Sequence, residues 1–285
     1  MILRLMVLAC LAGAAGLIFL AWPRSPLVQV PEGFDVSSAI WGEKGAWLAT
    51  AAGCKSCHTV PGGAAYAGGR ALETPFGTFY SPNLTPDETG LAGWAVEDFV
   101  RAVRHGVGKG GVPLYPTFPY ASYARMTDAD AAALYAYFMS LAPVRNEIAA
   151  HNLPLAFKWR GVLNGWRTLF LEATALDPEK NRGRYLAEAL GHCGECHTPR
   201  TPLGNLDHTR RFEGTPHGPD GEKVPAITAA ALADWSVDDI AELLKSGFKP
   251  DYDNVQGSMG EVVAESTSRL DDADRQAIAA YLKQQ

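Results

Sequence analysis

The sequence has almost no cysteine to spare, and this scarcity excludes a fold held together by structural disulfides. Four of its five cysteines lie in two five-residue segments of the form Cys-x-x-Cys-His, and the fifth, Cys10, lies in an apolar run near the N-terminus. A domain that relied on disulfides would carry further cysteines at other spacings. The four motif cysteines are therefore expected to be held by something other than one another.

An excess of positive charge is missing as well. The chain has 25 Lys and Arg residues against 31 Asp and Glu residues, a net charge of −6 at pH 7. Proteins that bind nucleic acid need a basic surface to neutralise phosphates, so no nucleic-acid partner is expected. The acidic C-terminal half would favour a partner with a basic docking face, or would serve only to keep the surface soluble.

No strand pattern of any length appears in the sequence. Apolar residues recur instead at helical spacing, as in Leu134, Tyr137 and Phe138 or in Ile278 and Tyr281. Glycine (29) and proline (19) are abundant and indicate many loops. The expected fold is mainly α, and 285 residues suffice for about two domains.

One long hydrophobic run is present, from Leu5 to Trp22, and its 18 residues include no charge. That length is just enough to cross a bilayer as a helix. The small residues that a cleavage site needs lie in the middle of the run, which favours an uncleaved anchor over a cleaved signal peptide. Residues 1–24 are thus predicted to form an N-terminal transmembrane helix that holds the chain on the bacterial inner membrane, with the bulk of the protein in the periplasm.

The rest of the chain is a diverged internal repeat. Residues 81–106 resemble residues 224–247, with a tryptophan, an aspartate and a final glycine at matching places. Each half also ends in a similar helical pattern. The repeat divides the chain into a first domain at 35–142, a connector at 143–177 and a second domain at 178–285.

The connector is unusually rich in aromatic residues, with Phe157, Trp159, Trp166 and Phe170 among proline and glycine breaks. Such density argues against a floppy linker. We expect the connector to pack across both domains, and the alternative is a docking surface for a partner subunit.

Each domain contains one Cys-x-x-Cys-His segment, formed by Cys54, Cys57 and His58 in the first domain and by Cys193, Cys196 and His197 in the second. Two thiols at this spacing can add to the two vinyl groups of a haem while the adjacent histidine ligates the iron, which is the pattern of c-type haem attachment. A zinc site would need a matching ligand pair nearby, and a thioredoxin-like motif would need a βαβ context. Two covalently bound haem c groups are predicted, with His58 and His197 as proximal iron ligands.

A methionine sulfur is a common sixth ligand in electron carriers. Outside the N-terminal run the chain has only Met126, Met139 and Met259. Met259 lies in a Gly-Ser-Met-Gly stretch between two predicted helices, where a loop can fold over the ring, and is the predicted iron ligand of the second haem. Met126 is the predicted iron ligand of the first haem, because Met139 lies at a core-like position within a helix.

The first haem has open alternatives. The repeat places Phe118, which cannot ligate iron, where the second domain has Met259, since each follows a matching glycine by twelve residues. A five-coordinate haem that binds small ligands, or ligation by His105, therefore stays open beside ligation by Met126.

Together these segments resemble the dihaem c-type cytochromes that act as membrane-associated cytochrome c subunits of bacterial periplasmic alcohol, gluconate, fructose and aldehyde dehydrogenase complexes. The resemblance rests on ETPFGTFYSPNLTPDETGLAGW, VPLYPTFPYASYARMTDADAAALYAYFMS and NRGRYLAEALGHCGECHTPRTPLG. It implies two tandem cytochrome c-like haem domains. The chain departs from the family in having two motifs where many such subunits have three, and in having Phe118 where the family often has methionine.

The resemblance also implies a role. The subunit would take electrons from a catalytic dehydrogenase of flavin, quinone-cofactor or molybdenum type and pass them to a respiratory acceptor, whether quinone, cytochrome or oxidase. No catalytic residue of its own is expected. Two alternatives stay open: a free-standing anchored shuttle between a bc1-type complex and a terminal oxidase, and a dihaem peroxidase-type enzyme that would use an open first haem.

Overall fold

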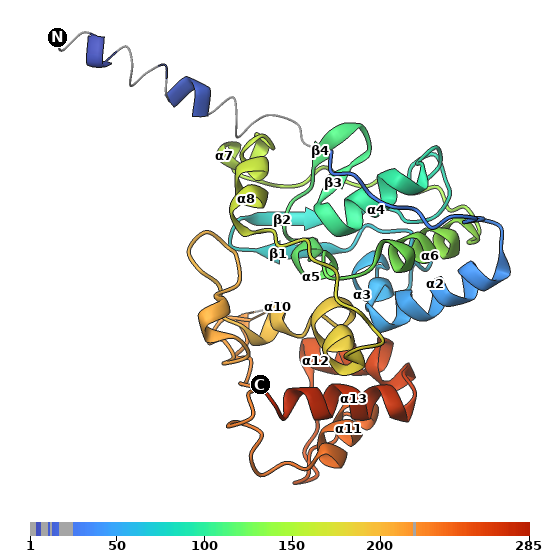
Figure 1. Cartoon of the computed structure of the whole chain (residues 1–285), viewed down its shortest axis with the longest axis vertical. Helices are drawn as coiled ribbons and strands as arrows, with labels where there is room; N and C mark the ends of the chain where they lie inside the picture. The colour runs from blue at the N-terminus through green and yellow to red at the C-terminus, as the bar shows by residue number, and fades with distance from the viewer. Residues whose placement is uncertain (1–3, 7–10, 12, 17–24, 219–220) are drawn as a thin grey trace.

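The computed structural model describes residues 4–6, 11, 13–16, 25–218 and 221–285. Figure 1 shows two helical units stacked along the long axis, with the N-terminal unit above and the C-terminal unit below. The prediction of a mainly helical chain is confirmed.

The N-terminal unit follows the order expected from the repeat. Its helices are α2 (Ala39–Ala51), α3 (Cys54–His58), α4 (Val96–His105), α5 (Tyr120–Tyr123) and α6 (Asp128–Met139), with a 3₁₀ turn at Lys109–Gly111. Helix α4 ends at Gly106, whose φ of 62° is the left-handed conformation that favours glycine. Helix α6 begins at Thr127, whose side chain accepts a hydrogen bond from the Asp130 amide.

The C-terminal unit repeats this order. Its elements are α9 (Arg182–Arg184), which continues into a π-helical turn (Tyr185–Leu190), then α10 (Gly194–His197), α11 (Val237–Ser246), α12 (Gly257–Glu265) and α13 (Asp272–Leu282), with 3₁₀ turns at His208–Arg210 and Thr267–Arg269. Helix α11 ends at Gly247, with φ of 81°. The Asp271 side chain caps α13 by accepting from the Asp274 amide. The two units therefore use the same start and stop signals.

In each unit the first helix crosses the last one at a glycine. A Cβ added to Gly45 would lie 2.0 Å from the Ala133 carbonyl oxygen, and one added to Gly183 would lie 2.0 Å from the Ala277 carbonyl oxygen. Only glycine lets the two backbones approach this closely. This crossing holds the first helix against the core, and so it fixes the position of the motif that follows that helix.

Two short antiparallel hairpins were not predicted. Strand β1 (Ala71–Thr74) pairs with β2 (Gly77–Tyr80), and β3 (Val107–Gly108) pairs with β4 (Val112–Pro113). With four and two residues to a strand, the alternation of apolar and polar side chains is too brief to stand out in a sequence.

The connector carries two helices, α7 (Leu155–Lys158) and α8 (Val162–Phe170). The Tyr115 hydroxyl of the N-terminal unit donates to the Phe157 carbonyl oxygen (2.8 Å). The Trp166 indole nitrogen donates to the Leu203 carbonyl oxygen of the C-terminal unit (2.9 Å). The connector thus contacts both units, as its aromatic content led us to expect.

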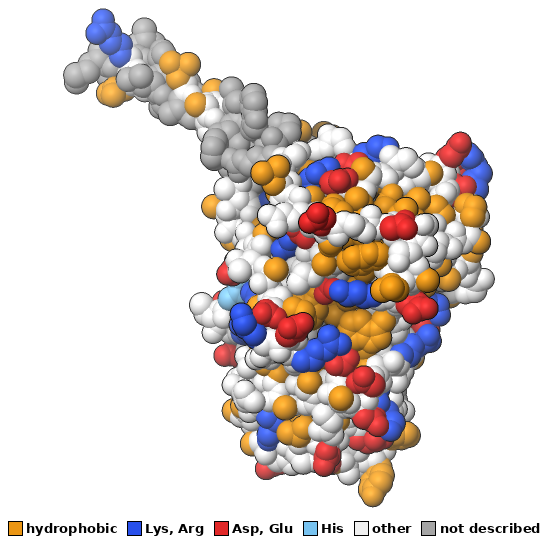
Figure 2. Space-filling view, turned by 45° about the vertical axis from the view of Figure 1, so that its right-hand side comes forward, with side chains coloured by type: hydrophobic (Ala, Val, Ile, Leu, Met, Phe, Trp, Pro, Cys, Tyr) orange, Lys and Arg blue, Asp and Glu red, His pale blue; other side chains and the backbone are white. Residues whose placement is uncertain are grey.

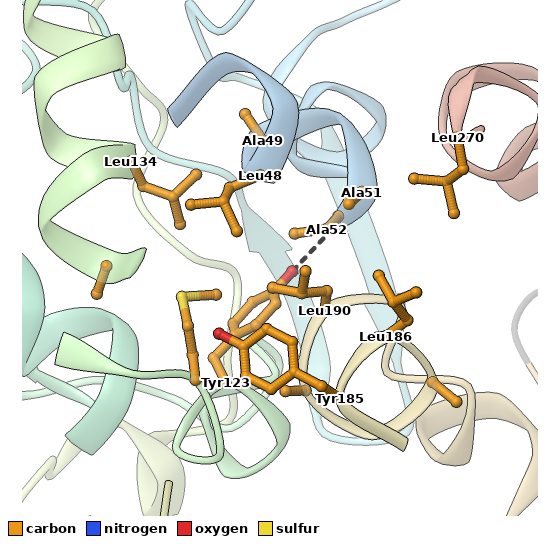
Figure 3. Packing of buried hydrophobic residues seen from close by; sticks show 14 of the residues in the cluster. Leu48, Ala49, Ala51, Ala52, Tyr123, Leu134, Tyr185, Leu186, Leu190 and Leu270 are labelled. Atoms are coloured by element: carbon orange, nitrogen blue, oxygen red, sulfur yellow. Dashed lines mark hydrogen bonds between the residues drawn. The ribbon is translucent and has the colours of Figure 1, made fainter. Parts of the chain in front are cut away.

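One hydrophobic core runs through both units (Figure 3). Leu48 and Leu134 come from the upper unit, and Tyr185, Leu186 and Leu190 come from the lower unit. All five are at most 3% exposed, so the contact between the units is as tightly packed as the interior of each. The units are therefore held in a fixed mutual position.

The predicted N-terminal transmembrane helix is wrong. Among the residues that the structure describes, no helix is long and apolar enough to cross a membrane. Part of the predicted anchor at residues 1–24 lies outside the described residues. The predicted localisation, a single span in the bacterial inner membrane with haem domains in the periplasm, rested on this helix and is corrected with it.

Candidate functional site

The first motif forms a single helical turn directly after α2. Gly53, with φ of 61°, separates α2 from α3, which runs from Cys54 to His58. Cys54 and Cys57 are three residues apart and so lie on one face of that turn. In the second motif Cys193 directly precedes α10, so both motifs present two thiols and one imidazole from a compact turn. All four motif thiols are free.

Both imidazole rings are oriented by a backbone carbonyl. The Nδ1 atom of His58 lies 2.9 Å from the Pro82 carbonyl oxygen, and Nδ1 of His197 lies 2.8 Å from the Pro225 carbonyl oxygen. Because a carbonyl oxygen only accepts, Nδ1 carries the proton and Nε2 keeps its lone pair. Burial lowers the pKa of both rings, so both are neutral near pH 7. A neutral ring with Nδ1 bonded to a carbonyl is the form in which histidine ligates a metal through Nε2.

The backbone around each motif is the same in both units. Tyr66 and Phe212 both have φ of 61°, a left-handed conformation that is uncommon outside glycine. Their amides donate to the side-chain hydroxyls of Thr59 (3.0 Å) and Thr198 (3.1 Å), directly after each motif histidine. A strained turn kept at both places indicates that this loop is held for a purpose that both sites share.

The surroundings of the thiols do not fit a redox-active cysteine pair or a zinc site. Burial raises the pKa of Cys54 and of Cys193 to about 12 and that of Cys196 to about 11, and it also raises the pKa of Cys57. Reactive cysteines have lowered pKa values. No cluster of three or more His, Cys, Asp or Glu side chains that could hold a metal ion occurs in the part of the chain that the structure describes. A structural zinc site needs four such ligands.

The same surroundings fit covalent haem. Cys57 of the first motif is solvent-exposed, so a group can reach its thiol. Large apolar side chains stay only partly buried at matching places in the two units, namely Leu84 and Ile227, Trp94 and Trp235, and Phe118 and Met259. An apolar ring bound at the motifs would give these side chains a partner. The residues present therefore fit a haem in each unit.

Phe118 and Met259 follow a matching loop-closing hydrogen bond in the two units, although Phe118 precedes helix α5 and Met259 lies within α12. The Gly106 carbonyl oxygen accepts from the Leu114 amide (2.8 Å), and the Gly247 carbonyl oxygen accepts from the Val255 amide (2.9 Å). Both bonds close a loop of the same length, and Phe118 and Met259 each follow the donor by four residues. The equivalence predicted from residue spacing is thus fixed by a hydrogen bond.

Met259 lies on the inward face of helix α12. Residues four apart share a helix face, so Met259 groups with Val263, which is 7% exposed, whereas Glu261 and Glu265 lie about half a turn away. Met259 therefore points to the interior of its own unit. Its role as an iron ligand stays a prediction.

The other predicted ligand, Met126, is completely buried in the core. It directly precedes the cap of α6, as Leu270 directly precedes the cap of α13, and both amides donate to a carbonyl three residues back. Leu270 is also buried in the core. Met126 thus occupies a position that the second unit fills with a packing residue, and its ligation of the first haem stays a prediction.

The two motifs meet at the interface between the units. Lys55 of the first motif pairs with Glu265 of α12 (3.0 Å), and Glu195 of the second motif accepts from Ser122 of α5 (2.6 Å). The first motif therefore contacts α12, which contains Met259. The second motif contacts α5, which follows Phe118. Besides burial and Glu195, the Cys57 thiol contributes to the raised pKa of Cys196.

Sequence reasoning missed two residues between the motifs. The Tyr123 hydroxyl donates to the Ala52 carbonyl oxygen (3.0 Å), just before the first motif (Figure 3). The Tyr123 ring also lies edge-on to that of His192, with 5.5 Å between centroids. His192 directly precedes the second motif and has φ of 38°. Nothing in their local sequence signals this contact, because Tyr123 and His192 come from different units.

Known proteins with similar sequences agree with this geometry. The cytochrome c family model matches residues 42–142. A diheme cytochrome c-type protein of Cereibacter sphaeroides is 45% identical over 98% of this chain and 95% of its own length. The gluconate 2-dehydrogenase cytochrome c subunit of Pantoea cypripedii is 41% identical over 85% of this chain, and the cytochrome c subunit of the quinone-dependent alcohol dehydrogenase of Gluconacetobacter polyoxogenes is 41% identical over 90% of it. This chain spans only 58% of the length of each of these two subunits.

Proposed function

The chain belongs to the c-type cytochromes, and we propose that it is a dihaem electron-transfer subunit that relays electrons from a catalytic dehydrogenase to a respiratory acceptor. The family resemblance noted in the sequence is confirmed, and the family carries covalently bound haem c. When bound, each haem supplies an iron that takes up and releases one electron.

In this proposal the chain's own residues hold and orient two haems. Cys54 and Cys57 attach the first haem, and Cys193 and Cys196 attach the second. The Nε2 atoms of His58 and His197 ligate iron, and the Pro82 and Pro225 carbonyls keep both rings in the ligating tautomer. Met259 is the proposed sixth ligand of the second haem; ligation of the first haem by Met126 remains the prediction made from the sequence.

The observation that carries the proposal is the docking of each motif on the other unit. The pairs Lys55–Glu265 and Ser122–Glu195 hold the two motif turns against one interface. Haems attached to these two turns would share that interface, and in this proposal they pass electrons across it. A rigid pair of close redox groups favours a relay over two independent sites.

The proposed partner is a catalytic dehydrogenase subunit of flavin, quinone-cofactor or molybdenum type. Similar proteins are named as cytochrome subunits of gluconate, alcohol and fructose dehydrogenases, and this supports such a partner. On the face seen in Figure 2, hydrophobic side chains gather at mid-height among mixed basic and acidic ones. Such a surface favours docking by shape and apolar contact rather than by a field of one sign.

Purification of the tagged full chain from the organism that encodes it tests the proposal. A dehydrogenase subunit should copurify under mild conditions, and its substrate should reduce both haems. The Cys193→Ala/Cys196→Ala variant should lose one of the two haems and the onward transfer, whereas Cys10→Ser should keep both. A clean monomer that only a bc1-type complex reduces would overturn the proposal in favour of the free shuttle.

A further inference from the structure

The two units share one backbone frame, so any ligand residue in one unit can be compared with its counterpart in the other. The comparison rests on the loop-closing hydrogen bonds at Gly106 and Gly247 and on the caps at Thr127 and Asp271. It therefore rests on structure as well as on sequence similarity.

The first unit has three methionine or histidine side chains outside its motif, and none of them stands at the counterpart of Met259. His105 aligns with Ser246, Met126 with Leu270, and Met139 with Lys283. The Ser246 hydroxyl donates to a carbonyl of its own helix, Leu270 is buried in the core, and the Lys283 ammonium donates to loop carbonyls. In the second unit these three places serve packing and capping.

Two of the three are also fixed by their surroundings. Met126 is fully buried, and the core would lose a large packed side chain if it turned outward. Besides burial, which lowers its pKa to about 4, the groups that act electrostatically on His105 are Arg104, Asp128, Arg167 and Arg101.

Phe118 alone stands where the second unit has Met259, and it is locked in place by other aromatic rings. Its ring lies 5.6 Å from that of Tyr123 and 6.4 Å from that of Tyr120, measured between centroids. Like Met259, it is partly buried against the core. A phenyl ring has no lone pair to give to iron, but it closes the site with apolar surface.

We propose that the first haem site binds small exogenous ligands, because Phe118 stands at the counterpart of Met259 and none of His105, Met126 and Met139 does. The site suits a small neutral diatomic molecule such as carbon monoxide or nitric oxide, since apolar surroundings favour neutral ligands over anions. This inference rests on the proposed binding of two haems but not on the proposed dehydrogenase partner.

Spectroscopy of the purified full chain with both haems attached tests the inference, using carbon monoxide as the probe. The ferric protein should show one high-spin and one low-spin haem, and the reduced protein should bind carbon monoxide at about half of its haem. Met126→Leu, which installs the counterpart residue, should leave both spectra unchanged. Phe118→Leu should keep the high-spin signal, because leucine cannot ligate iron either.

Phe118→Met adds a possible ligand to the first site. It should convert the high-spin signal to a low-spin signal, and a second methionine-to-iron absorption band should appear. Two low-spin haems in the wild type, with one methionine band lost in Met126→Leu, would overturn the inference and establish Met126 as the ligand. Low-spin haem that persists in both variants and excludes carbon monoxide would overturn it as well. A haem count of one per chain would refute the two-haem function itself, so the two failures are distinguishable.

Discussion

Glu188 is the residue whose removal should most weaken the contact between the units. Its side chain is 3% exposed and is paired with Arg125 of the N-terminal unit and with Arg184 and Arg211 of its own unit, while the Tyr281 hydroxyl donates to it. Glu188→Gln would leave three guanidinium groups around a neutral amide. Removing one partner of a buried ion pair costs about 3–5 kcal/mol. The three arginines are 18%, 42% and 30% exposed, so water offsets part of that loss and we expect about 3 kcal/mol.

Guanidinium-induced unfolding, followed by tryptophan fluorescence, measures this loss. The matched control is Glu213→Gln, because Glu213 pairs with Arg210 on the surface, where both side chains are about half exposed. An exposed pair contributes at most about 1 kcal/mol, so the control should barely shift the midpoint. A loss below about 1 kcal/mol in Glu188→Gln would show that the arginines find other partners and would refute the reasoning.

The same cluster predicts a dependence of stability on pH. Burial alone would raise the pKa of Glu188, but the Tyr281 hydrogen bond and the charges of Arg211 and Arg125 outweigh it and lower the pKa below the ordinary value of 4.5. A depressed carboxyl pKa contributes stability above its unfolded-state value and loses it as pH falls through the folded-state value. The wild type should therefore lose more stability than Glu188→Gln as pH falls below about 4.5.

Three further predictions concern packing and ligation. Gly45→Ala should destabilise the chain by about 3 kcal/mol or prevent folding, since its Cβ would lie 2.0 Å from the Ala133 carbonyl oxygen; Gly42→Ala, in the same helix with nothing within 4 Å, should stabilise it by about 0.5–1 kcal/mol in the same denaturation assay. Tyr120→Phe should raise the melting temperature, because the Tyr120 hydroxyl is buried without a hydrogen-bond partner, which costs about 1 kcal/mol or more; a lower melting temperature would show that an ordered water satisfies it. Met259→Leu should remove the methionine-to-iron absorption band and lower the potential of the second haem, and an unchanged band would rule out Met259 as its ligand.

The features that the sequence predicts correctly correspond to local patterns of residues. The two Cys-x-x-Cys-His turns, the glycines that end α4 and α11, and the capped starts of α6 and α13 all depend on residues within a few positions of each other. Because the sequence is an internal repeat, each of these patterns occurs twice. The hairpins escaped because strands of two to four residues are shorter than the window in which periodicity can be recognised.

The docking of the two units could not be read in this way. Lys55 and Glu265 are 210 positions apart in the sequence. Glu188 pairs with Arg125, which lies 63 positions before it, and with Tyr281, which lies 93 positions after it. No local propensity encodes such pairs, because they form only once both units have folded and packed. The predicted N-terminal helix is a different kind of error: the length and apolar character of a run predict a span, but no such helix occurs among the described residues.

The segments that distinguish the two proposed haem sites are the same ones that join the units. Helix α5 follows Phe118 and docks on the second motif, whereas α12 contains Met259 and docks on the first. Only eight positions separate Phe118 from Met126, but eleven separate Met259 from Leu270, so the first unit has the shorter segment. A segment that need not bring sulfur to iron can be shorter and can pack directly on its neighbour. In Phe118→Met, the methionine sulfur must therefore reach iron from the shorter segment. If the sulfur does not reach iron, carbon monoxide binding by the wild type is the decisive measurement.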